Sequence, residues 1–487
     1  MAYSTRVADQ MLGHSPVAGL DRRNLAPVQV FAQSVGGAGP AAAMAVTPVI
    51  VAATAGTATI WSFAVATGLA LLVASCIGQF TRRMAAAGSL YSLTAKGLGP
   101  SGAFLCGAAL LVGYGMLTVS AIAGATARVG ALLARFGWAG AESPVALGGL
   151  ALLLATLVAA LVVRGARLSA WVVLGVEAVS IGLMLVVFGT LLTQHGFTLD
   201  WRQLLPTRFD VSFGSVAAGV LPALAAFIGF EAAAAMGVEA RRPFRTVPRA
   251  VRRTAALIGL LTLLAAYTQV AAFAQVPGGL AAQPEPVPAL AAGYRMPWLS
   301  ALLDAGLATS FLACSMATIT AMVRLLFTTG REGVLPARLG RTHGRFRTPH
   351  VAVAVCVPPL ALAAAGLLAA GVPANQVLTG PLTAAALGYL LAYLVVCLAA
   401  PVFLHKIGEL TAPPVVATSV IVPVLLGVLV AYALWMPLAP APLIAVGVLA
   451  LAGARYWWLR RRRPARLAAI GAYDHPSTGD LLGGVPR

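Results

Sequence analysis

Long apolar stretches, separated by short polar segments, follow one another along the whole chain. Most are at least roughly 20 residues long, the length that an α-helix needs to cross about 30 Å of hydrocarbon. They predict about twelve membrane-spanning helices, over residues 26–54, 58–80, 102–127, 145–163, 168–193, 213–238, 254–275, 299–326, 350–370, 376–403, 414–435 and 440–459. The pattern therefore indicates an all-α, polytopic membrane protein with no sizeable soluble domain.

The composition supports this fold class. Of the 487 residues, 60% are hydrophobic and only 10% are charged, and the mean hydropathy is +0.89, which excludes an ordinary water-soluble globule. The histidines are scattered without an HExxH or other paired spacing, and the five cysteines show no CxxC spacing. An enzyme needs a nucleophile, a base or metal ligands held together, so we predict that the chain is not an enzyme and has no cofactor or metal centre.

The basic residues are distributed unevenly between the two sides of the predicted membrane. The net charge is +19, and of the 33 lysines and arginines only Arg128, Arg135, Arg202, Arg208 and Arg295 fall on the side opposite the N-terminus. By the positive-inside rule, both termini are expected in the cytoplasm, with the protein in the cell membrane. The basic runs are thus interpreted as topology signals that contact the anionic lipid bilayer, and no nucleic-acid partner is expected.

The first and the sixth predicted spans are interrupted by glycine. Residues 34–40 read Ser-Val-Gly-Gly-Ala-Gly-Pro, and residues 228–231 read Ile-Gly-Phe-Glu. Glycine and proline weaken a helix, and a broken helix is tolerated in a membrane only where protein, water or a ligand meets the freed backbone groups. Breaks at equivalent positions of two five-helix sets are the sign of an inverted-repeat transporter. The alternative is that the glycines of the first break only allow close helix packing.

We therefore predict a 5+5 inverted repeat, with helices 1–5 and 6–10 as the repeats, helices 1 and 6 broken, and two added C-terminal helices. The expected segments are a cytoplasmic N-terminal lead-in (1–25), the first repeat (26–193), an extracellular loop (194–211), the second repeat (212–404), helices 11 and 12 (405–460) and a basic, mobile cytoplasmic tail (461–487).

Three acidic residues, Glu177, Glu231 and Asp304, lie inside predicted spans. An ionisable side chain at this depth costs at least a few kcal/mol, so its default interpretation is functional. Glu231 is the first candidate for coupling or gating because its helix is broken, and Glu177 is the second. The alternative for Glu231 is a carboxylate that tethers a neighbouring helix through hydrogen bonds. Asp304 is interpreted as a snorkelling or capping residue.

Several motifs resemble those of the amino acid/polyamine/organocation superfamily. The stretch Phe-Ile-Gly-Phe-Glu at 227–231, continuing to Glu-Ala-Arg-Arg-Pro at 239–243, is similar to its sixth-helix signature. Further similar stretches lie at residues 88–91, 97–100, 164–170, 245–250, 321–327, 330–336 and 347–350. The resemblance implies a permease, a symporter or antiporter, that moves amino acids, amines or similar small organic cations by alternating access, usually driven by protons or sodium.

The charge of helix ends then suggests how such a substrate is held. The amides expected to receive an amino acid's carboxylate, at the positive end of the second half of helix 1, are those of Gly36, Gly37, Ala38 and Gly39. The carbonyls expected to receive its ammonium are those around Phe227, Ile228 and Gly229. The rings of Phe227 and Phe230 offer a further surface for a cation.

Three features depart from the family pattern. Residues 37–43 read Gly-Ala-Gly-Pro-Ala-Ala-Ala, where the better-known relatives carry Gly-Ser-Gly-Ile-Phe or similar, as in a divergent bacterial-type branch. Ala225 stands where some relatives place an aromatic gate, so such a gate is supplied elsewhere or is absent. Ser180 stands where some proton-driven relatives have a lysine in helix 5. Its hydroxyl, with those of Ser310 and Ser315 in helix 8, would offer oxygen ligands to a sodium ion. The alternative for Ser180 is a small residue that packs helices together.

On the cytoplasmic side, Leu90, Tyr91 and Leu93 are expected to pack under the bundle as parts of an inner gate, with Arg324 as a gate partner. These three residues belong to a polar loop over residues 82–100, which is too short to span the membrane. The alternative for this loop is an interfacial amphipathic segment. A channel is disfavoured because no ring of carbonyls or acids repeats within the spans, and a non-transporting sensor on the same scaffold is a further alternative. The sequence leaves open the substrate, the choice between H⁺ and Na⁺, and the oligomeric state.

Overall fold

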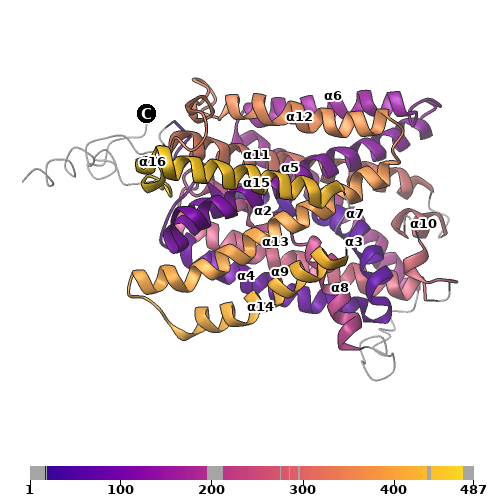
Figure 1. Cartoon of the computed structure of the whole chain (residues 1–487). Coiled ribbons are helices and arrows are strands. Elements are labelled where there is room, and N and C mark those ends of the chain that lie inside the picture. The colour runs from indigo at the N-terminus through magenta and orange to yellow at the C-terminus, as the bar shows by residue number, and fades with distance from the viewer. Residues whose placement is uncertain are drawn as a thin grey trace, which may run out of the picture.

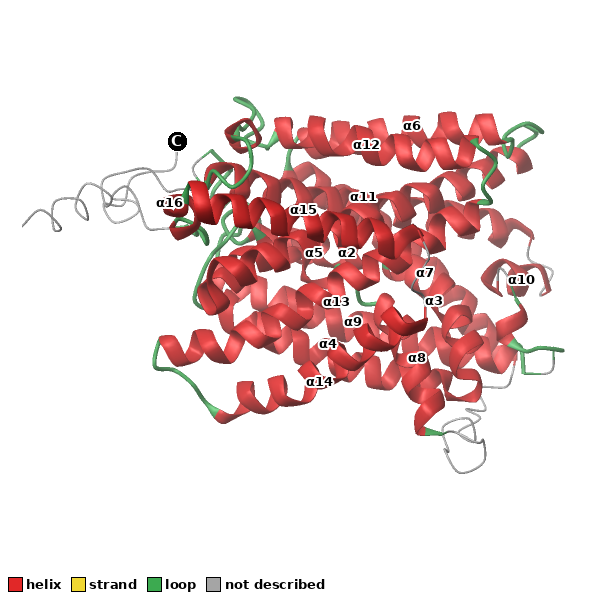
Figure 2. Cartoon of the chain, in the orientation of Figure 1, coloured by secondary structure: helices red, strands yellow, loops and turns green. Residues whose placement is uncertain are grey.

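The computed structural model describes residues 17, 19–194, 212–274, 276–283, 286–293, 297–435 and 440–474. Helices joined by short loops account for almost all of this part of the chain (Figure 2). One isolated parallel bridge joins Leu25 to Ala240. The prediction of an all-α, multi-pass fold is confirmed.

The helices follow the predicted spans closely. They are α2 (Pro27–Ala38), α3 (Pro40–Ala55), α4 (Thr59–Thr81), α5 (Ser89–Arg135), α6 (Pro144–Val163), α7 (Ala166–Gln194), α8 (Phe213–Ala225) with the 3-10 helix η3 (Phe230–Met236), α9 (Pro243–Ala272), α11 (Pro297–Arg331), α12 (His350–Ala369), α13 (Ala374–Lys406), α14 (Ala412–Trp435) and α15 (Pro440–Arg462). Shorter elements connect them: η1 (Gly56–Ala58), η4 (Leu280–Ala282), α10 (Pro286–Gly293), η5 (Ala337–Gly340) and α16 (Pro464–Ala468).

Ten helical stretches among the described residues are long and apolar enough to cross a membrane. The stretch Pro27–Thr81 counts once among them although it contains two predicted spans, and α8, with 13 residues, is shorter than the rest. The total of twelve spans therefore stays a prediction.

The start of α5 differs from the sequence-based expectation. Residues 82–100 were expected to form a polar loop, whereas the helix begins at Ser89 and kinks at Gly99, which has φ 73°. Only glycine adopts this left-handed conformation without strain, and the following Pro100 suits the first turn of a new helical segment. The short helix before the kink buries Leu90, Tyr91 and Leu93, so this segment packs into the protein rather than lying free in solvent.

The middle of the bundle is formed by α5 and α11. In the most apolar 18-residue stretch of each helix, 83% of α5 and 89% of α11 is buried. The corresponding values are 22% for α14 and 11% for α15, so these last two helices lie at the periphery. Three helices of the first predicted repeat, α4, α5 and α6, pack against α9, α11 and α12, which hold the same places in the second. The inverted repeat itself stays a prediction.

The first and last described segments of the chain lie together on one side of the bundle, where Arg22 forms an ion pair with Asp474 at 2.8 Å. We call this the terminal side, and the opposite side, where α10 lies, the far side (Figure 1). Part of the segment predicted as a mobile tail is folded: residues 464–468 form α16, and the chain after it, as far as Asp474, contacts the bundle. Residues 475–487, and 195–211 of the predicted extracellular loop, lie outside the described part.

Candidate functional site

The first predicted break lies at Gly39. Helix α2 ends at Ala38, Gly39 has φ 55° and ψ 64°, and α3 restarts at Pro40. The Gly39 N–H turns back to the carbonyl of Val35, and Pro40 has no N–H to offer. The amides of residues 36–38 lie within the last turn of α2 and are used inside that helix. The positive end of the second half-helix therefore belongs to the first turn of α3. Its first amide, that of Ala41, lies two residues beyond Gly39, the last amide that the sequence suggested.

The second break follows α8. This helix ends at Ala225, the next residues are not helical, and Gly229, with φ 90°, leads into η3. Both helices that the sequence predicted to be broken are therefore interrupted in the structure.

The two breaks touch each other through their backbones. A Cβ atom built on Gly37 would lie 2.5 Å from the carbonyl oxygen of Gly229, and one built on Gly229 would overlap the carbonyl of Gly37. In addition, the Ser34 hydroxyl donates a hydrogen bond to the Phe230 carbonyl. Glycine is therefore required at both positions, because no side chain fits between the two backbones.

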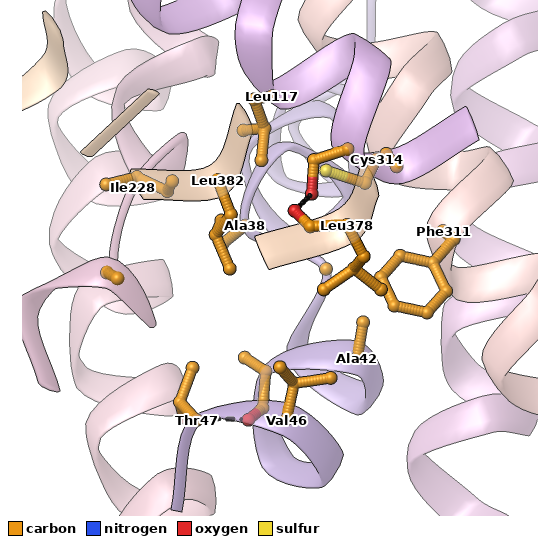
Figure 3. Close-up of a pocket in the computed structure, with 15 residues that line it drawn as sticks. Ala38, Ala42, Val46, Thr47, Leu117, Ile228, Phe311, Cys314, Leu378 and Leu382 are labelled. Atoms are coloured by element: carbon orange, nitrogen blue, oxygen red, sulfur yellow. Dashed lines mark hydrogen bonds between the residues drawn. The ribbon is translucent and has the colours of Figure 1, made fainter. Parts of the chain in front are cut away.

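A cavity lies beside the breaks (Figure 3). Four of its lining residues come from α3, which packs against η4 and α10 on the far side. Its lining residues are Ala38, Gly39, Ala42, Ala43, Val46, Thr47, Leu117, Ser120, Ala121, Ala225, Ile228, Phe311, Cys314, Leu378 and Leu382. None of these side chains carries a charge. Its volume is about 40 Å³, against roughly 10–15 Å³ for one water molecule on the same measure, so it holds a small ligand or must widen to accept a larger one.

The polar side chains of this wall are already engaged. The Thr47 hydroxyl donates to the Ala43 carbonyl at 2.8 Å, and the Ser120 hydroxyl donates to the Leu378 carbonyl at 2.7 Å. Figure 3 shows both bonds at the edges of the cavity. The surface offered to a ligand is therefore mostly apolar, apart from the backbone groups at the helix breaks.

The structure separates the predicted substrate contacts into two groups. The residues that line the cavity are Ala38, Gly39 and Ile228, and those that lie behind its wall are Gly36, Gly37, Phe227, Gly229 and Phe230. The ring of Phe230 packs against that of Tyr393, with centroids 5.4 Å apart, and Phe227 is fully buried. Neither ring faces the cavity, so neither offers the cation surface that the sequence suggested.

Sequence reasoning missed the cavity residues from α5, α11 and α13. Apart from Phe311, they are small or aliphatic positions within long apolar helices, and no spacing or motif distinguishes them from ordinary packing residues. Phe311 of α11 is the one aromatic residue among the lining residues. Its ring lies over Gly124, where a Cβ atom would come within 2.8 Å of it. Phe311 thus brings an aromatic group to a cavity in which helix six contributes only Ala225 and Ile228.

Glu231 is fully buried and lies behind the cavity wall. Its carboxylate accepts hydrogen bonds from the Tyr393 hydroxyl at 2.5 Å and from the Tyr114 hydroxyl at 3.2 Å. The same Tyr393 oxygen accepts the N–H of Gly229 at 3.3 Å. Glu231 therefore ties the break in helix six to α5 and α13, which is the tethering arrangement considered as the alternative. Its role in coupling stays a prediction.

Glu177 of α7 lies next to the start of α3. One carboxylate oxygen accepts a hydrogen bond from the Ser310 hydroxyl at 2.9 Å, and the other has no hydrogen-bond partner within the described part of the chain. The Ser310 oxygen in turn accepts the Ala42 N–H at 3.4 Å. A buried carboxylate with a free oxygen thus stands at the positive end of the half-helix that borders the cavity.

The three serines suggested as a sodium site each make a hydrogen bond to a different partner. The Ser180 hydroxyl donates to the Gly306 carbonyl at 2.8 Å, the Ser315 hydroxyl donates to the Phe311 carbonyl at 3.0 Å, and Ser310 serves Glu177. Each hydroxyl donates a hydrogen bond within or between helices, which agrees with the packing alternative for Ser180. A donating hydroxyl keeps its oxygen lone pairs, so the sodium site at these three residues stays a prediction.

Two further buried acids have arginine partners. Asp304 pairs with Arg128 at 3.2 Å and with Arg135 at 3.3 Å, on the far side, so it is a tether between α11 and α5 rather than a snorkelling residue. On the terminal side, Glu239 pairs with Arg324 at 2.6 Å. Burial raises the pKa of Glu239, and the Arg324 guanidinium opposes this rise.

Comparison with known proteins identifies the family. The family model described as amino acid permease matches residues 25–451. The chain is 26% identical to the branched-chain amino acid permease BcaP of Bacillus subtilis over 62% of its own length and 66% of the relative's. It is 28% identical to cationic amino acid transporter 4 of Homo sapiens over 67% of its own length and 53% of the relative's. It thus spans less than two thirds of the length of either relative.

A solved structure of similar fold supports the architecture. The crystal structure of a mutant of the Eremococcus coleocola manganese transporter superposes with a TM-score of 0.54 at 11% identity, over 91% of this chain and 94% of that one. The fold, the two broken helices and the match along most of the sequence agree with the predicted superfamily. The chain is a multi-pass membrane protein, not an enzyme, and it belongs to the amino acid permease family.

Proposed function

We propose that this protein is a secondary active transporter that moves a small neutral amino acid across the cell membrane by alternating access. The observation that carries this proposal is the cavity beside the two helix breaks. Broken helices that meet at mid-membrane leave backbone donors and acceptors free for a substrate, while the surrounding helices exclude lipid. The positive end of α3 borders this cavity. It suits the substrate's carboxylate when Glu177, which lies at the same helix end, carries a proton and therefore no negative charge.

The apolar wall favours an aliphatic side chain over a cationic one. A buried cation needs an opposite charge or an aromatic face. The lining residues include no acid, and Phe311 is their single aromatic group. Of the two relatives described above, one is named a branched-chain amino acid permease and the other a cationic amino acid transporter. The apolar cavity suits a branched-chain amino acid better than a cationic one. Alanine, valine and leucine are therefore the first substrates to test, before lysine and arginine.

Coupling to protons or sodium is the second part of the proposal. Glu177 is the first candidate group, because one of its oxygens has no hydrogen-bond partner among the described residues, while both oxygens of Glu231 accept hydrogen bonds. Glu231 is the second. The split of basic residues supports a cytoplasmic position for the terminal side, and thus for both chain ends.

Uptake by purified protein in liposomes tests the proposal. Valine and leucine are supplied at matched concentrations with lysine, under a proton gradient, a sodium gradient or neither. The expected result is saturable uptake of the aliphatic amino acids that exceeds lysine uptake by at least about tenfold and depends on one gradient. Equal entry of all substrates without saturation indicates a channel. No uptake, together with no change of melting temperature by any amino acid, contradicts the transporter proposal.

Glu177→Gln tests the coupling group, with Glu231→Gln as its matched comparison. If Glu177 carries the coupled ion, its variant exchanges substrate across the membrane without a gradient but no longer accumulates it. An unchanged gradient dependence in Glu177→Gln, with a loss in Glu231→Gln, would reverse the assignment.

A further inference from the structure

The carboxylate of Glu332, just after the end of α11, joins two distant segments on the terminal side. One oxygen accepts the backbone N–H groups of Gly471 and Ala472 at 2.8 and 2.7 Å. The other accepts the Tyr91 hydroxyl at 2.5 Å. Hydrogen bonds to an ionised acceptor are about twice as strong as neutral ones. Glu332 therefore holds the C-terminal segment, the beginning of α5 and the end of α11 in one cluster.

The C-terminal segment makes further specific contacts. The Asp474 N–H donates to the Ala85 carbonyl at 2.8 Å, and its carboxylate pairs with Arg22 of the N-terminal segment. Arg466 donates to the Gly333 carbonyl at 3.1 Å. Gly471 has φ 93°, and a Cβ atom there would lie 2.8 Å from that of Ala95. The segment is thus fitted to its docking surface along its length rather than attached at one point.

Apolar contacts accompany these polar ones. Leu467 of α16 is buried in a cluster with Leu459 of α15 and Val334, and Ile470 packs against the same cluster. The Lys96 ammonium lies 4.7 Å from the centroid of the Tyr473 ring. The C-terminal segment therefore covers the short helix that begins α5, together with the loop that follows α11.

This cluster is connected to the break in helix six. Two residues before Tyr91, the Ser89 hydroxyl hydrogen-bonds the Tyr114 hydroxyl at 3.0 Å. Tyr114 donates to Glu231, and Glu231 is bound by Tyr393 beside Gly229. Hydrogen bonds thus connect the C-terminal segment to the central breaks, with the backbone between Ser89 and Tyr91 as one covalent link in the series.

We propose that residues 464–474 form an intramolecular clasp that keeps the terminal side of the transporter closed, and that Glu332 is its attachment point. The proposal rests on the alternating-access function above, because a transporter must open the terminal side to release or load its substrate there. Opening moves the start of α5 away from the end of α11, and this separation breaks the bonds at Glu332 first. Release of the clasp shifts the population toward the state that is open on the terminal side.

Cys314, which lines the cavity, provides a native reporter. Membrane-impermeant maleimide is applied to vesicles whose terminal side faces the reagent, and modification of the Cys314 peptide is followed by mass spectrometry. The variants are a chain that ends at Arg463, which lacks the clasp, and Glu332→Ala. Both are expected to raise the rate of Cys314 labelling at least about fivefold, a typical size for coupling between sites. Tyr91→Phe, which removes one of three bonds to Glu332, is expected to give a smaller rise.

Two controls isolate the clasp. A chain that ends at Asp474 keeps every described contact and should label at the rate of the full chain. Arg83→Ala removes the half-exposed ion pair with Glu409, which joins other segments of the same side, and it should also leave the rate unchanged. In the chain that ends at Arg463, adding Glu332→Ala should raise the rate no more than Tyr91→Phe does in the full chain, because only the Tyr91 bond to Glu332 is left to lose.

An unchanged labelling rate in both the shortened chain and Glu332→Ala overturns the clasp. If only the shortened chain fails to fold, Glu332→Ala decides. The labelling requires no substrate, so its outcome is separate from that of the uptake assay. Labelling that responds without uptake of any amino acid contradicts the proposed substrate class but not the clasp, and uptake without a labelling response contradicts the clasp alone.

Discussion

The two sides of the bundle are held by different kinds of interaction. On the terminal side, charged groups and backbone amides join segments that lie far apart in the chain, as in the pairs Arg324–Glu239 and Arg22–Asp474. On the far side, the cavity wall consists of uncharged side chains. The prominent ionic tether there is the cluster of Asp304 with Arg128 and Arg135, which joins only α5 and α11.

This difference explains where the chain carries recognisable motifs. Directional hydrogen bonds and ion pairs need particular residue types at fixed positions, so the terminal side leaves motifs such as residues 239–250 and 330–336. Apolar packing tolerates many side chains of similar volume, so a wall built from alanine, leucine and valine leaves little trace. The residues that join segments on the terminal side are therefore easier to recognise from the sequence than those that line the cavity.

The largest expected effect is on the terminal side. Arg324→Ala leaves Glu239 buried without its partner, which should lower the free energy of unfolding by about 3–5 kcal/mol. Unfolding in mixed detergent micelles measures this loss. Arg83→Ala, at a half-exposed pair on the same side, should cost at most about 1 kcal/mol. Equal losses in the two variants would show that burial does not determine how much an ion pair on this side contributes to the free energy of unfolding.

The second prediction concerns the contact between the breaks, where the two sides meet. Gly229→Ala adds a side chain at φ 90° against the Gly37 carbonyl, which should cost about 2–3 kcal/mol and reduce uptake at least tenfold. The matched control is Gly182→Ala in α7, where a Cβ atom meets nothing within 4 Å. Full uptake by Gly229→Ala would mean that the breaks do not pack as described.

The third prediction tests the far side directly. Asp304→Asn removes the carboxylate but leaves both arginines, which are 20% and 44% exposed, able to reach water. The loss in the free energy of unfolding should be about 1.5 kcal/mol, the lower end for a hydrogen bond to a charged group. A loss equal to that of Arg324→Ala would remove the contrast between the two sides.

The smallest expected effect is at Ser180. Its hydroxyl bridges α7 to the Gly306 carbonyl of α11, so Ser180→Ala should cost about 1 kcal/mol or less. Uptake measured with and without sodium should respond to the ion as the unchanged protein does. Loss of a sodium effect in this variant would support the sodium site predicted from the sequence.

The sequence predicted several features because they depend on local composition. Spans such as 58–80 and 350–370 agree with helices Thr59–Thr81 and His350–Ala369 within one residue at each end. The break near Gly39 was marked by three glycines and a proline. The helical start of α5 was missed, because residues 82–100 were interpreted as a polar loop, although the packing of Leu90, Tyr91 and Leu93 under the bundle was expected.

The assignment of the site was less complete for a physical reason. The breaks were placed correctly in the chain, but which of their atoms face the cavity depends on how α5, α11 and α13 pack around them. Phe230 was expected to face a ligand and instead packs on Tyr393, a residue 163 positions away whose approach no local pattern encodes. The partners of Ser180 and Ser310 were likewise set by neighbouring helices.

The sequence by itself determined that this is a membrane protein, which residues form its helices and where two of these helices break. The reason is that the length of an apolar stretch and the presence of helix-breaking residues are local properties of the chain. The tertiary structure alone decided which side chains line the cavity and that the C-terminal segment docks on Glu332. It also decided that Glu231 is tethered by two tyrosines, while one oxygen of Glu177 has no hydrogen-bond partner among the described residues. Those outcomes depend on distances between residues far apart in the chain, and such distances exist only after the helices pack.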